Sequence, residues 1–327
     1  MESTSQLRGK RCAILGAGGF IGRSLSAALV ECGADVRACR ISGEPGTVPG
    51  TSWHRADFAS ASSLTAAVAD AEIVVHCAGR MTPETSNQRP LQDIEENLLG
   101  SVRLLECCID AKVKKLVFAS SGGTVYGPGA LTPAAETDAT EPISSYGIVK
   151  LAYEKYLALY RRSRGLDSVS LRISNVYGRG QEPGARGIVA LALSKAVAGE
   201  PIAIWGDGSV VRDFVHIDDV VDAIMRSMLL DLPDAPRVYN IGSGVGRSVR
   251  EVLATIEAIY GRPLTIAYLP GKAADVPYSV LDVRLARQFL GWTPQRAWHE
   301  GVQDAYDWLQ EELRAPARTP AKRPRQG

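Results

Sequence analysis

Tyr146 and Lys150 form a Tyr-x-x-x-Lys pair at the start of a segment, 146–162, that is predicted to be a long helix. Residues four apart share one face of a helix, so the lysine ammonium would lie beside the phenol. A neighbouring positive charge lowers the pKa of a phenol from about 10 toward neutrality. The pair therefore predicts an acid/base group that can move a proton on a hydroxyl or a carbonyl.

A serine-rich stretch stands about 25 residues before this pair, where Ser120 and Ser121 follow a predicted strand at 116–119. A hydroxyl at the carboxyl end of a parallel strand points toward the cleft in which ligands bind. We expect Ser121 to orient a substrate, with Thr124 as the alternative hydroxyl. The competing interpretation is that the serines only cap the turn, a position that serine favours.

A glycine-rich turn, Gly-Ala-Gly-Gly-Phe-Ile-Gly at 16–22, follows an apolar run and opens a helical pattern in which Phe20 and Ile21 come first. Read as Gly-x-x-Gly-x-x-Gly, its key positions are Gly16, Gly19 and Gly22. Such a turn needs a positive φ, and a side chain in it would block a pyrophosphate, whereas the helix N-terminus offers free N–H groups. The turn predicts a binding site for NAD or NADP.

The residue that ends the second strand of such a unit reads the adenosine ribose: an acid binds the 2′-OH, and an arginine accommodates a 2′-phosphate. That place falls at Arg40, after a predicted strand at 35–39, and no acidic residue is close. Arg40 thus favours NADP over NAD, unless it merely stacks on adenine. Further cofactor contacts are expected after the next two strands, at Asp57, Phe58, Ala78 and Gly79.

Alternating strands and helices would position all these residues. Strands are predicted at 10–15, 35–39, 73–76, 116–119 and 168–173, and helices at 20–32, 62–69, 91–111 and 146–162. The alternation implies parallel βαβ units, hence an α/β fold with a doubly wound Rossmann sheet. We expect this cofactor domain to span 10–178.

The second half is punctuated by Pro and Gly and contains one clear helical pattern, 248–260. It predicts a smaller, mixed α/β substrate-binding lobe over 179–313 that is interleaved with the sheet and covers a cleft. The final stretch, 314–327, is rich in Pro and basic residues, which is typical of a disordered tail.

The composition excludes several classes of protein. A net charge of +1 gives no electrostatic footprint for nucleic acid. The six cysteines form no Cys-x-x-Cys pair, and no histidine stands at zinc-ligand spacing, so we expect free thiols in a reducing cytosol and no metal. The chain has no apolar run of about 18 residues, so we expect no membrane span. It begins without a signal-peptide core, so we expect a cytoplasmic location.

Together these motifs resemble the nucleotide-sugar epimerase/dehydratase family of extended short-chain dehydrogenases over residues 11–313. The stretches that carry the resemblance are GAGGFIG at 16–22, NLLG at 97–100, SSGGTVYG at 120–127, YGIVK at 146–150, LRISNVYGRG at 171–180, WGDGSVVRDFVHIDDV at 205–220, YNIGSG at 239–244 and LGW at 290–292.

The resemblance implies roles for individual residues. Ser121, Tyr146 and Lys150 would form the catalytic triad, with Lys150 also at the cofactor. Asn97 would support the active-site helix beside the cofactor.

The resemblance also implies a grip on the substrate's diphosphate, by Asn175 and by the two-pronged guanidinium of Arg212. Lys272 stands where many relatives have a second arginine and would keep only the charge. Asp213 and the acids at 218 and 219 would position that segment.

Two departures from the family pattern matter. In many relatives the catalytic hydroxyl stands three residues before Val-Tyr-Gly, which is Gly122 here, whereas counting back from Tyr146 gives Ser121. Family dehydratases and decarboxylases place acids just after that hydroxyl, where this chain has Gly122 and Gly123. Without an acid to assist elimination, both of those reactions are disfavoured.

Two reactions at C4 of a nucleotide hexose remain. A 4-keto reductase would use NADPH once and release it, and a 4-epimerase would keep NAD and return the hydride to the other face. Arg40 favours the reductase, and SSGGTVYG at 120–127 together with TSNQRP at 85–90 resembles 4-keto-6-deoxyhexose reductases of the dTDP-fucose-forming kind. In favour of the epimerase, 4-epimerases are the commonest activity in the family, and some also carry the paired glycines. An inactive cofactor-sensing protein is a remote alternative, because Tyr146 and Lys150 are both present. The family typically pairs the helices 91–111 and 146–162 across a two-fold axis, which implies a homodimer through a four-helix bundle.

Overall fold

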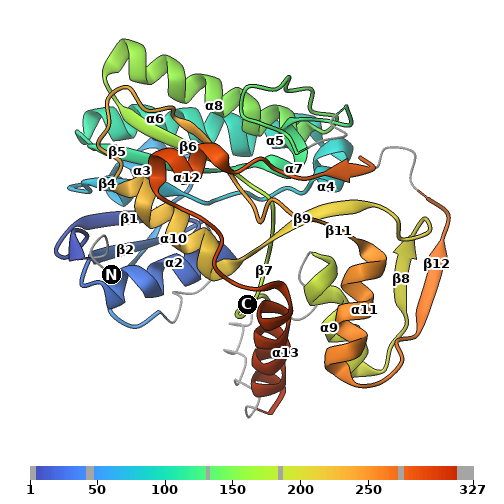
Figure 1. Cartoon of the computed structure of the whole chain (residues 1–327). Coiled ribbons are helices and arrows are strands. Elements are labelled where there is room, and N and C mark those ends of the chain that lie inside the picture. Colours follow the sequence, from blue (N-terminus) through green and yellow to red (C-terminus); the bar gives the residue numbers. More distant parts are fainter. Residues whose placement is uncertain (1–4, 42–47, 130–132, 183–186, 272–275, 315–327) are drawn as a thin grey trace, which may run out of the picture.

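The computed structural model describes residues 5–41, 48–129, 133–182, 187–271 and 276–314, and its core is a parallel sheet of seven strands. The strands pair in the order β10-β6-β5-β4-β1-β2-β3 (Figure 1). Their bounds are Arg11–Leu15 (β1), Asp35–Arg40 (β2), Thr51–Arg55 (β3), Ile73–His76 (β4), Lys115–Ser121 (β5), Asp167–Ile173 (β6) and Val238–Ile241 (β10). The expected doubly wound Rossmann sheet is confirmed.

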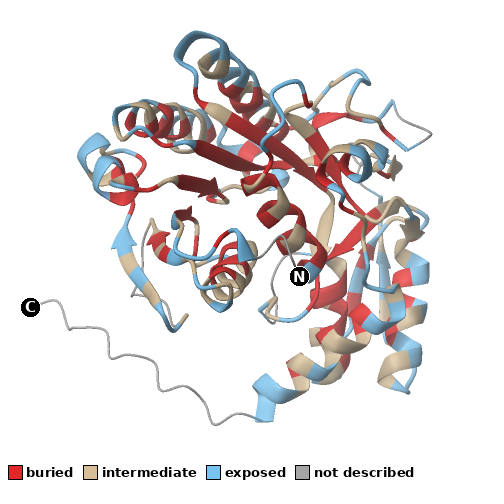
Figure 2. Ribbon diagram, turned by 60° about the vertical axis from the view of Figure 1, so that its left-hand side comes forward, coloured by how far each residue is buried: buried red, intermediate tan, exposed pale blue. Residues whose placement is uncertain are grey.

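Helices cover both faces of this sheet, which Figure 2 shows as a buried layer between helices with exposed outer surfaces. One face packs against α2 (Phe20–Glu31), α10 (Ile217–Met228) and α12 (Arg284–Leu290). The other face packs against α3 (Ala61–Val68), α6 (Gly100–Asp110) and α8 (Ser145–Arg164). Apolar residues of these helices pack against the sheet, among them Leu25 and Leu29 of α2, Leu64 of α3 and Leu157 of α8.

The helix predicted at 91–111 is continuous but not uniform. It consists of α5 (Pro90–Asp93), a six-residue π-helical segment η1 (Ile94–Leu99) and α6. A π turn contains one residue more than an α turn. Such turns are frequent at functional sites, and this one contains Asn97.

The rest of the chain forms a smaller lobe, at the right and bottom of Figure 1. Its helices are α9 (Ile188–Ala198), α11 (Val249–Tyr260) and α13 (Trp298–Arg314), and α11 confirms the helix predicted at 248–260. Its strands are β7 (Asn175–Tyr177), β8 (Ile202–Trp205), β9 (Val211–His216), β11 (Gly246–Ser248), β12 (Ile266–Leu269) and β13 (Tyr278–Ser279).

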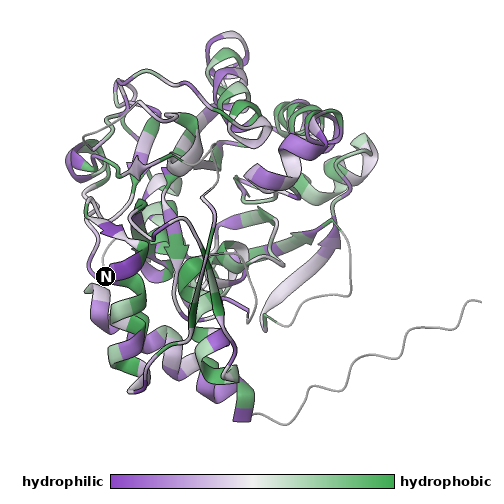
Figure 3. Cartoon of the chain, turned by 90° about the vertical axis from the view of Figure 1, so that its right-hand side faces the viewer, coloured by the Kyte–Doolittle hydropathy of each residue, from purple (hydrophilic) through white to green (hydrophobic). Residues whose placement is uncertain are grey.

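The lobe has an apolar core of its own between α9, α11, α13 and β8. Figure 3 shows its helices as green on the inner side and purple on the outer side. Because β10 and α10 return to the large sheet, the second half of the chain is divided between the sheet and the lobe. Within the described ranges, no helix is long and apolar enough to cross a membrane, and no three His, Cys, Asp or Glu side chains gather as a metal site would require.

Candidate active site

The glycine-rich turn has the geometry that a dinucleotide requires. Gly16 has a φ of +93°, and a Cβ on it would lie 2.7 Å from the backbone nitrogen of Ala78. A Cβ on Gly22 would lie 2.2 Å from the Gly16 oxygen. Gly19 is the N-cap of α2, and among the described residues no side chain caps this helix. The turn therefore leaves the helix N-terminus open to an anionic group, and the residues present fit a bound pyrophosphate.

Arg40 lies over this turn, at a glycine that the sequence pattern did not single out. A Cβ on Gly18 would lie 2.4 Å from Arg40 Nε, whereas the nearest atom to a Cβ on Gly19 is the Gly16 oxygen at 3.4 Å. The crowded positions are thus Gly16, Gly18 and Gly22. The strand register explains why Arg40 lies beside the turn. Leu15, the last residue of β1, pairs with Cys39 of β2, so the next residue, Arg40, lies next to Gly16 and the residues that follow it.

The other expected cofactor residues divide into two groups. Ala78 and Gly79 line a cavity that also contains Asn97, Tyr146 and Lys150. Asp57 accepts a hydrogen bond from the Ala59 amide at 3.0 Å, and Phe58 is buried, stacked 5.3 Å from His76. Neither residue lines that cavity, and their expected contact with the cofactor stays a prediction.

The cavity around Tyr146 lies at the carboxyl end of the sheet, between β4, β5, η1 and α8. Its lining residues are His76, Ala78, Gly79, Asp93, Asn97, Ser101, Phe118, Tyr146, Val149, Lys150 and Tyr153. The fold thus brings the Tyr-x-x-x-Lys pair together with the residues that follow β4, as the sequence predicted.

Lys150 is buried beneath Tyr146. Its Nζ lies 5.5 Å from the centroid of the Tyr146 ring and donates a hydrogen bond to the Ala119 carbonyl at 2.8 Å. Burial lowers the pKa of Lys150 to about 8. An ammonium near this phenol favours its ionised form, so the pair can act as the predicted acid/base.

The end of β5 offers two candidate hydroxyls. Ser120 is buried and donates a hydrogen bond to Glu154 at 2.5 Å, so it is structural. A Cβ on Gly122 would lie 2.4 Å from Leu281 Cδ1, which leaves no room for a side chain at that position. Within the described part of the chain, Ser121 makes no capping bond to α7 (Gly122–Val125), and the buried Thr124 Oγ1 has no hydrogen-bond partner.

The residues expected at the diphosphate lie on neighbouring strands outside this cavity. Asn175 on β7 donates to the Asp213 carbonyl at 3.0 Å, and Arg212 on β9 donates to the Val276 carbonyl at 2.6 Å. Asp213 is fully buried and accepts hydrogen bonds from backbone amides, including that of Ser243 at 2.7 Å. Asp219 likewise accepts the amides of Gln295 and Arg296. Lys272 lies outside the described residues.

Sequence reasoning missed how the active-site helix is held. Ser144 is its N-cap and accepts the Gly147 amide at 3.2 Å. The amides of Ser145 and Tyr146 are instead bound by side chains of α4 (Pro83–Gln88): by Asn87 Oδ1 at 2.8 Å and Ser86 Oγ at 3.0 Å. The stretch TSNQRP contains these two residues, but nothing in its spacing reveals that it meets the helix of Tyr146.

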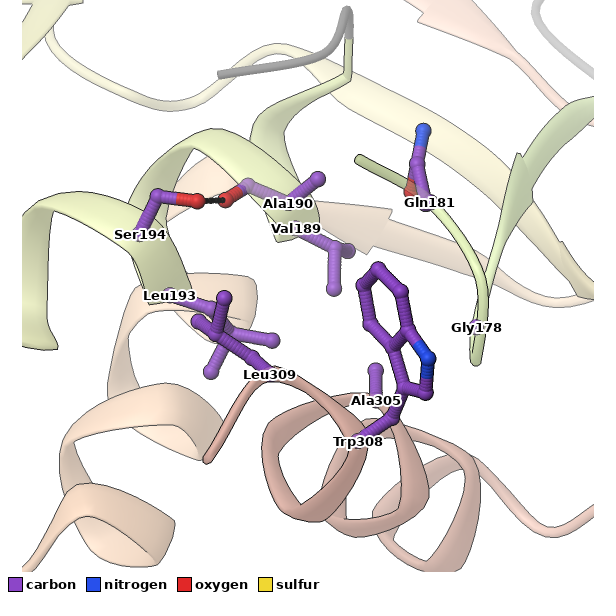
Figure 4. A pocket seen from close by; sticks show the side chains of 9 residues that line it. All are labelled: Gly178, Gln181, Val189, Ala190, Leu193, Ser194, Ala305, Trp308 and Leu309. Carbon is purple, nitrogen blue, oxygen red and sulfur yellow. Dashed lines mark hydrogen bonds between the residues drawn. The ribbon is translucent and has the colours of Figure 1, made fainter. Parts of the chain in front are cut away.

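A second pocket lies in the lobe, between α9 and α13 (Figure 4). Ser194 Oγ, at its edge, is bound to the Ala190 carbonyl at 2.7 Å. None of the predicted site residues lines this pocket, whose walls are Gly178, Gln181, Val189, Ala190, Leu193, Ser194, Ala305, Trp308 and Leu309.

The chain belongs to the NAD dependent epimerase/dehydratase family, whose model matches residues 12–242. It is 38% identical to a UDP-glucose 4-epimerase of Mycolicibacterium smegmatis over 232 residues, which is 71% of this chain and 74% of that protein. It is 32% identical to a dTDP-4-dehydro-6-deoxyglucose reductase of Escherichia coli over 300 residues, which is 88% of this chain and 94% of that protein.

The chain is also similar to solved structures of nucleotide-sugar 4-epimerases. A UDP-glucose 4-epimerase of Thermotoga maritima with UDP-glucose has a TM-score of 0.87 and 32% identity, covering 93% of this chain and 99% of that one. The Thermus thermophilus enzyme in complex with NAD has a TM-score of 0.84 and 32% identity, covering 92% and 99%. The chain is therefore an NAD(P)-dependent enzyme of the extended short-chain dehydrogenase type, related to nucleotide-sugar 4-epimerases and a 4-keto reductase.

Proposed function

We propose that the chain is a 4-keto reductase that converts a nucleotide-linked 4-keto-6-deoxyhexose to the 4-hydroxy sugar. The observation that carries this choice is the role of Ser86 and Asn87, which cap the helix of Tyr146. They belong to the stretch that resembles such reductases, so this stretch shapes the active site itself. The chain is also similar to the Escherichia coli dTDP-4-dehydro-6-deoxyglucose reductase over 94% of that protein's length.

In this reaction the Tyr146 phenol gives its proton to the C4 oxygen, and the Lys150 ammonium stabilises the phenolate that remains. Ser121, with Thr124 as the second hydroxyl, orients the same oxygen by a hydrogen bond. Gly16, Gly22 and the N-terminus of α2 would hold the cofactor, whose chemistry would be the delivery of a hydride. Asn97 supports the helix, and Ala78 and Gly79 let the backbone approach the cofactor.

NADP is the cofactor that we propose, because Arg40, the last residue of β2, lies over Gly18 of the glycine-rich turn. A guanidinium binds a 2′-phosphate by charge-assisted hydrogen bonds, whereas a carboxylate would repel it. For the substrate we propose diphosphate contacts from Asn175, Arg212 and Lys272, with the lobe at 179–313 covering the sugar. The free cysteines support a reducing, cytoplasmic location.

The test is to supply dTDP-4-keto-6-deoxyglucose with NADPH and follow the loss of NADPH absorbance. A reductase consumes one NADPH for each sugar reduced. Turnover of UDP-galactose to UDP-glucose without added cofactor, and no NADPH consumption on the keto sugar, would contradict the proposal.

The second candidate is a UDP-hexose 4-epimerase. The solved relatives of similar fold favour it, since the Thermus thermophilus epimerase is in complex with NAD. An epimerase needs the same Tyr146 and Lys150, because the Tyr146 phenolate accepts the proton of the C4 hydroxyl in one half of the reaction and the resulting phenol returns a proton to the C4 oxygen in the other. The reductase would release its oxidised cofactor after each turnover, whereas the epimerase would keep its cofactor bound throughout.

We also propose a homodimer through the outer faces of η1 and α8. Large apolar side chains are exposed on these two neighbouring elements, which would leave a water-facing apolar surface in a monomer. The exposed fraction is 44% for Ile94 and 45% for Leu99 on η1, and 55% for Ile148 and 52% for Leu159 on α8; Leu91 of the adjoining α5 is 75% exposed. Pairing of two such surfaces across a two-fold axis would bury all of them.

A further inference from the structure

Asp93, the last residue of α5, is a buried carboxylate in the wall of the active-site cavity. Its exposed fraction is 0%. One oxygen accepts a hydrogen bond from Ser145 Oγ at 2.8 Å, and the other accepts one from Asn97 Nδ2 at 2.7 Å. Asp93 thus joins η1 to the first residue of α8, immediately before Tyr146.

The connection continues to the cofactor side of the cavity. Asn97 Oδ1 accepts a hydrogen bond from the Arg80 amide at 3.2 Å, directly after Gly79. Asp93 is therefore the central member of a chain of contacts from the end of β4 to the helix of Tyr146. A displacement of Asp93 would move both ends.

Among the described residues, Asp93 has no cationic hydrogen-bond donor, because its two donors, Ser145 and Asn97, are both neutral. A buried charge is costly unless an opposite charge lies near it, and the cation in the same cavity wall is Lys150. The second carboxylate near Lys150, Glu154 of α8, is already paired with Arg172 at 2.8 Å.

Glu154 raises the pKa of Lys150 more than Asp93 does, so Asp93 is one of two carboxylates that favour the ammonium form. The other titratable groups next to Lys150 lie at the end of β4 and on α8. Burial lowers the pKa of His76 in β4 to about 3 and raises the pKa of the Cys77 thiol to about 12, so both are neutral near pH 7. From α8, Tyr146 and Tyr153 contribute phenols to the same cavity.

We propose that Asp93 is a positioning residue that fixes the place of Tyr146 and keeps Lys150 in its ammonium form. The inference rests on the proposed roles of Tyr146 and Lys150. The electrostatic part makes a specific prediction, since the loss of a nearby negative charge lowers the pKa of an ammonium or a phenol.

The experiment compares Asp93→Asn, which removes the charge at constant size, with Ser145→Ala, which removes one hydrogen bond and keeps the charge. The readout is the pH profile of kcat/KM on dTDP-4-keto-6-deoxyglucose with NADPH, or on UDP-galactose if that is the sugar converted. Asp93→Asn should lower kcat/KM about ten-fold and move its alkaline limb to lower pH by about one unit. Ser145→Ala should lower kcat and leave the limb in place.

Asp93→Glu, which keeps the charge and shifts its position, serves as the third variant. This variant should lower kcat and leave the alkaline limb of the pH profile unchanged. It tests the positioning role if Asp93→Asn fails to fold. In that case, wild-type kcat in Asp93→Glu would overturn the proposal. Thermal unfolding and NADPH binding, followed by tryptophan fluorescence, identify a variant that is merely unfolded.

An unchanged limb and unchanged kcat/KM in folded Asp93→Asn would overturn the inference, provided that Tyr146→Phe is inactive. Full activity of Tyr146→Phe would instead refute the proposed function. The two failures are therefore distinguishable.

Discussion

Tyr146 and Lys150 illustrate how a common sequence motif gains meaning from its surroundings. Spacing alone predicts that the two side chains share a helix face, but burial of Lys150 and its bond to the Ala119 carbonyl fix the ammonium under the phenol. The acid/base function therefore depends on β5 as much as on the motif itself.

Tyr146→Phe tests this function at the level of one atom. Removal of the phenol oxygen should lower turnover by about 10²- to 10⁴-fold while NADPH binding stays unchanged, because a positioned acid contributes roughly that factor. Tyr156→Phe, at an exposed tyrosine of the same helix, is the matched control and should retain turnover. A cofactor-sensing protein would show no catalytic difference between the two variants.

His76 makes the stability of the protein sensitive to acid. Its ring is buried, its Nε2 lies 2.9 Å from Ser101 Oγ, and burial lowers its pKa to about 3. An unfolded histidine takes up a proton near pH 6.5, so the unfolded state binds more protons below that pH. The stabilisation is complete above about pH 6.5 and is lost as the pH falls toward 3.

Urea unfolding at pH 7 and pH 5 measures this contribution. Between pH 7 and pH 5, protonation of His76 in the unfolded state should lower the free energy of unfolding of the wild type by about 2 kcal/mol. His76→Phe should not show this decrease. His299→Phe, at an exposed histidine, is the control and should show the same decrease in the free energy of unfolding as the wild type. Burial also lowers the pKa of His216, so some acid sensitivity should remain in every variant. Equal acid sensitivity of His76→Phe and the wild type would refute the assignment.

At the scale of elements, the local patterns predicted most of the first half but not α4 or the lobe helices α9 and α13. The glycine turn, the helices of the first half and α11 follow from periodicity and turn chemistry. The π turn of η1, the crowding of Gly18 by Arg40 and the closure of Gly122 by Leu281 do not. These features arise where segments distant in sequence meet, so no single segment encodes them.

The contact between α4 and α8 is a testable example. Ser86→Ala removes the acceptor of the Tyr146 amide and, as for the loss of a helix cap, should lower the free energy of unfolding by about 1 kcal/mol. We expect kcat to fall as well, because the amide belongs to the catalytic residue. Ser163→Ala, at the far end of α8, should change neither quantity appreciably. A stability loss with wild-type kcat would mean that Ser86 only supports the fold.

At the scale of the whole molecule, the exposed apolar side chains of η1 and α8 predict association. Ile148→Asp should convert a dimer to a monomer in sedimentation experiments, because a charge in a buried interface lacks a partner. Leu232→Asp introduces the same change at a residue that is 50% exposed elsewhere on the surface and should leave the dimer intact. A monomeric wild type would contradict the proposed interface.

The sequence could not decide between a reductase and an epimerase, because the residues that it identifies best lie on the sheet. The sheet supplies a cofactor turn and an acid/base pair that serve reduction and epimerisation equally. The choice between these reactions depends on whether the cofactor is exchanged after each turnover, and this depends on contacts between both parts of the chain and the bound dinucleotide.

The most direct test is therefore the cofactor content of the freshly purified protein, followed by titration with NADPH and NADH. We expect protein that holds little dinucleotide, binds NADPH more tightly than NADH and uses it to reduce a 4-keto-6-deoxy nucleotide sugar. Tightly held NAD in near-stoichiometric amount would contradict the account. It would assign the chain to the 4-epimerases and refute the interpretation of Arg40.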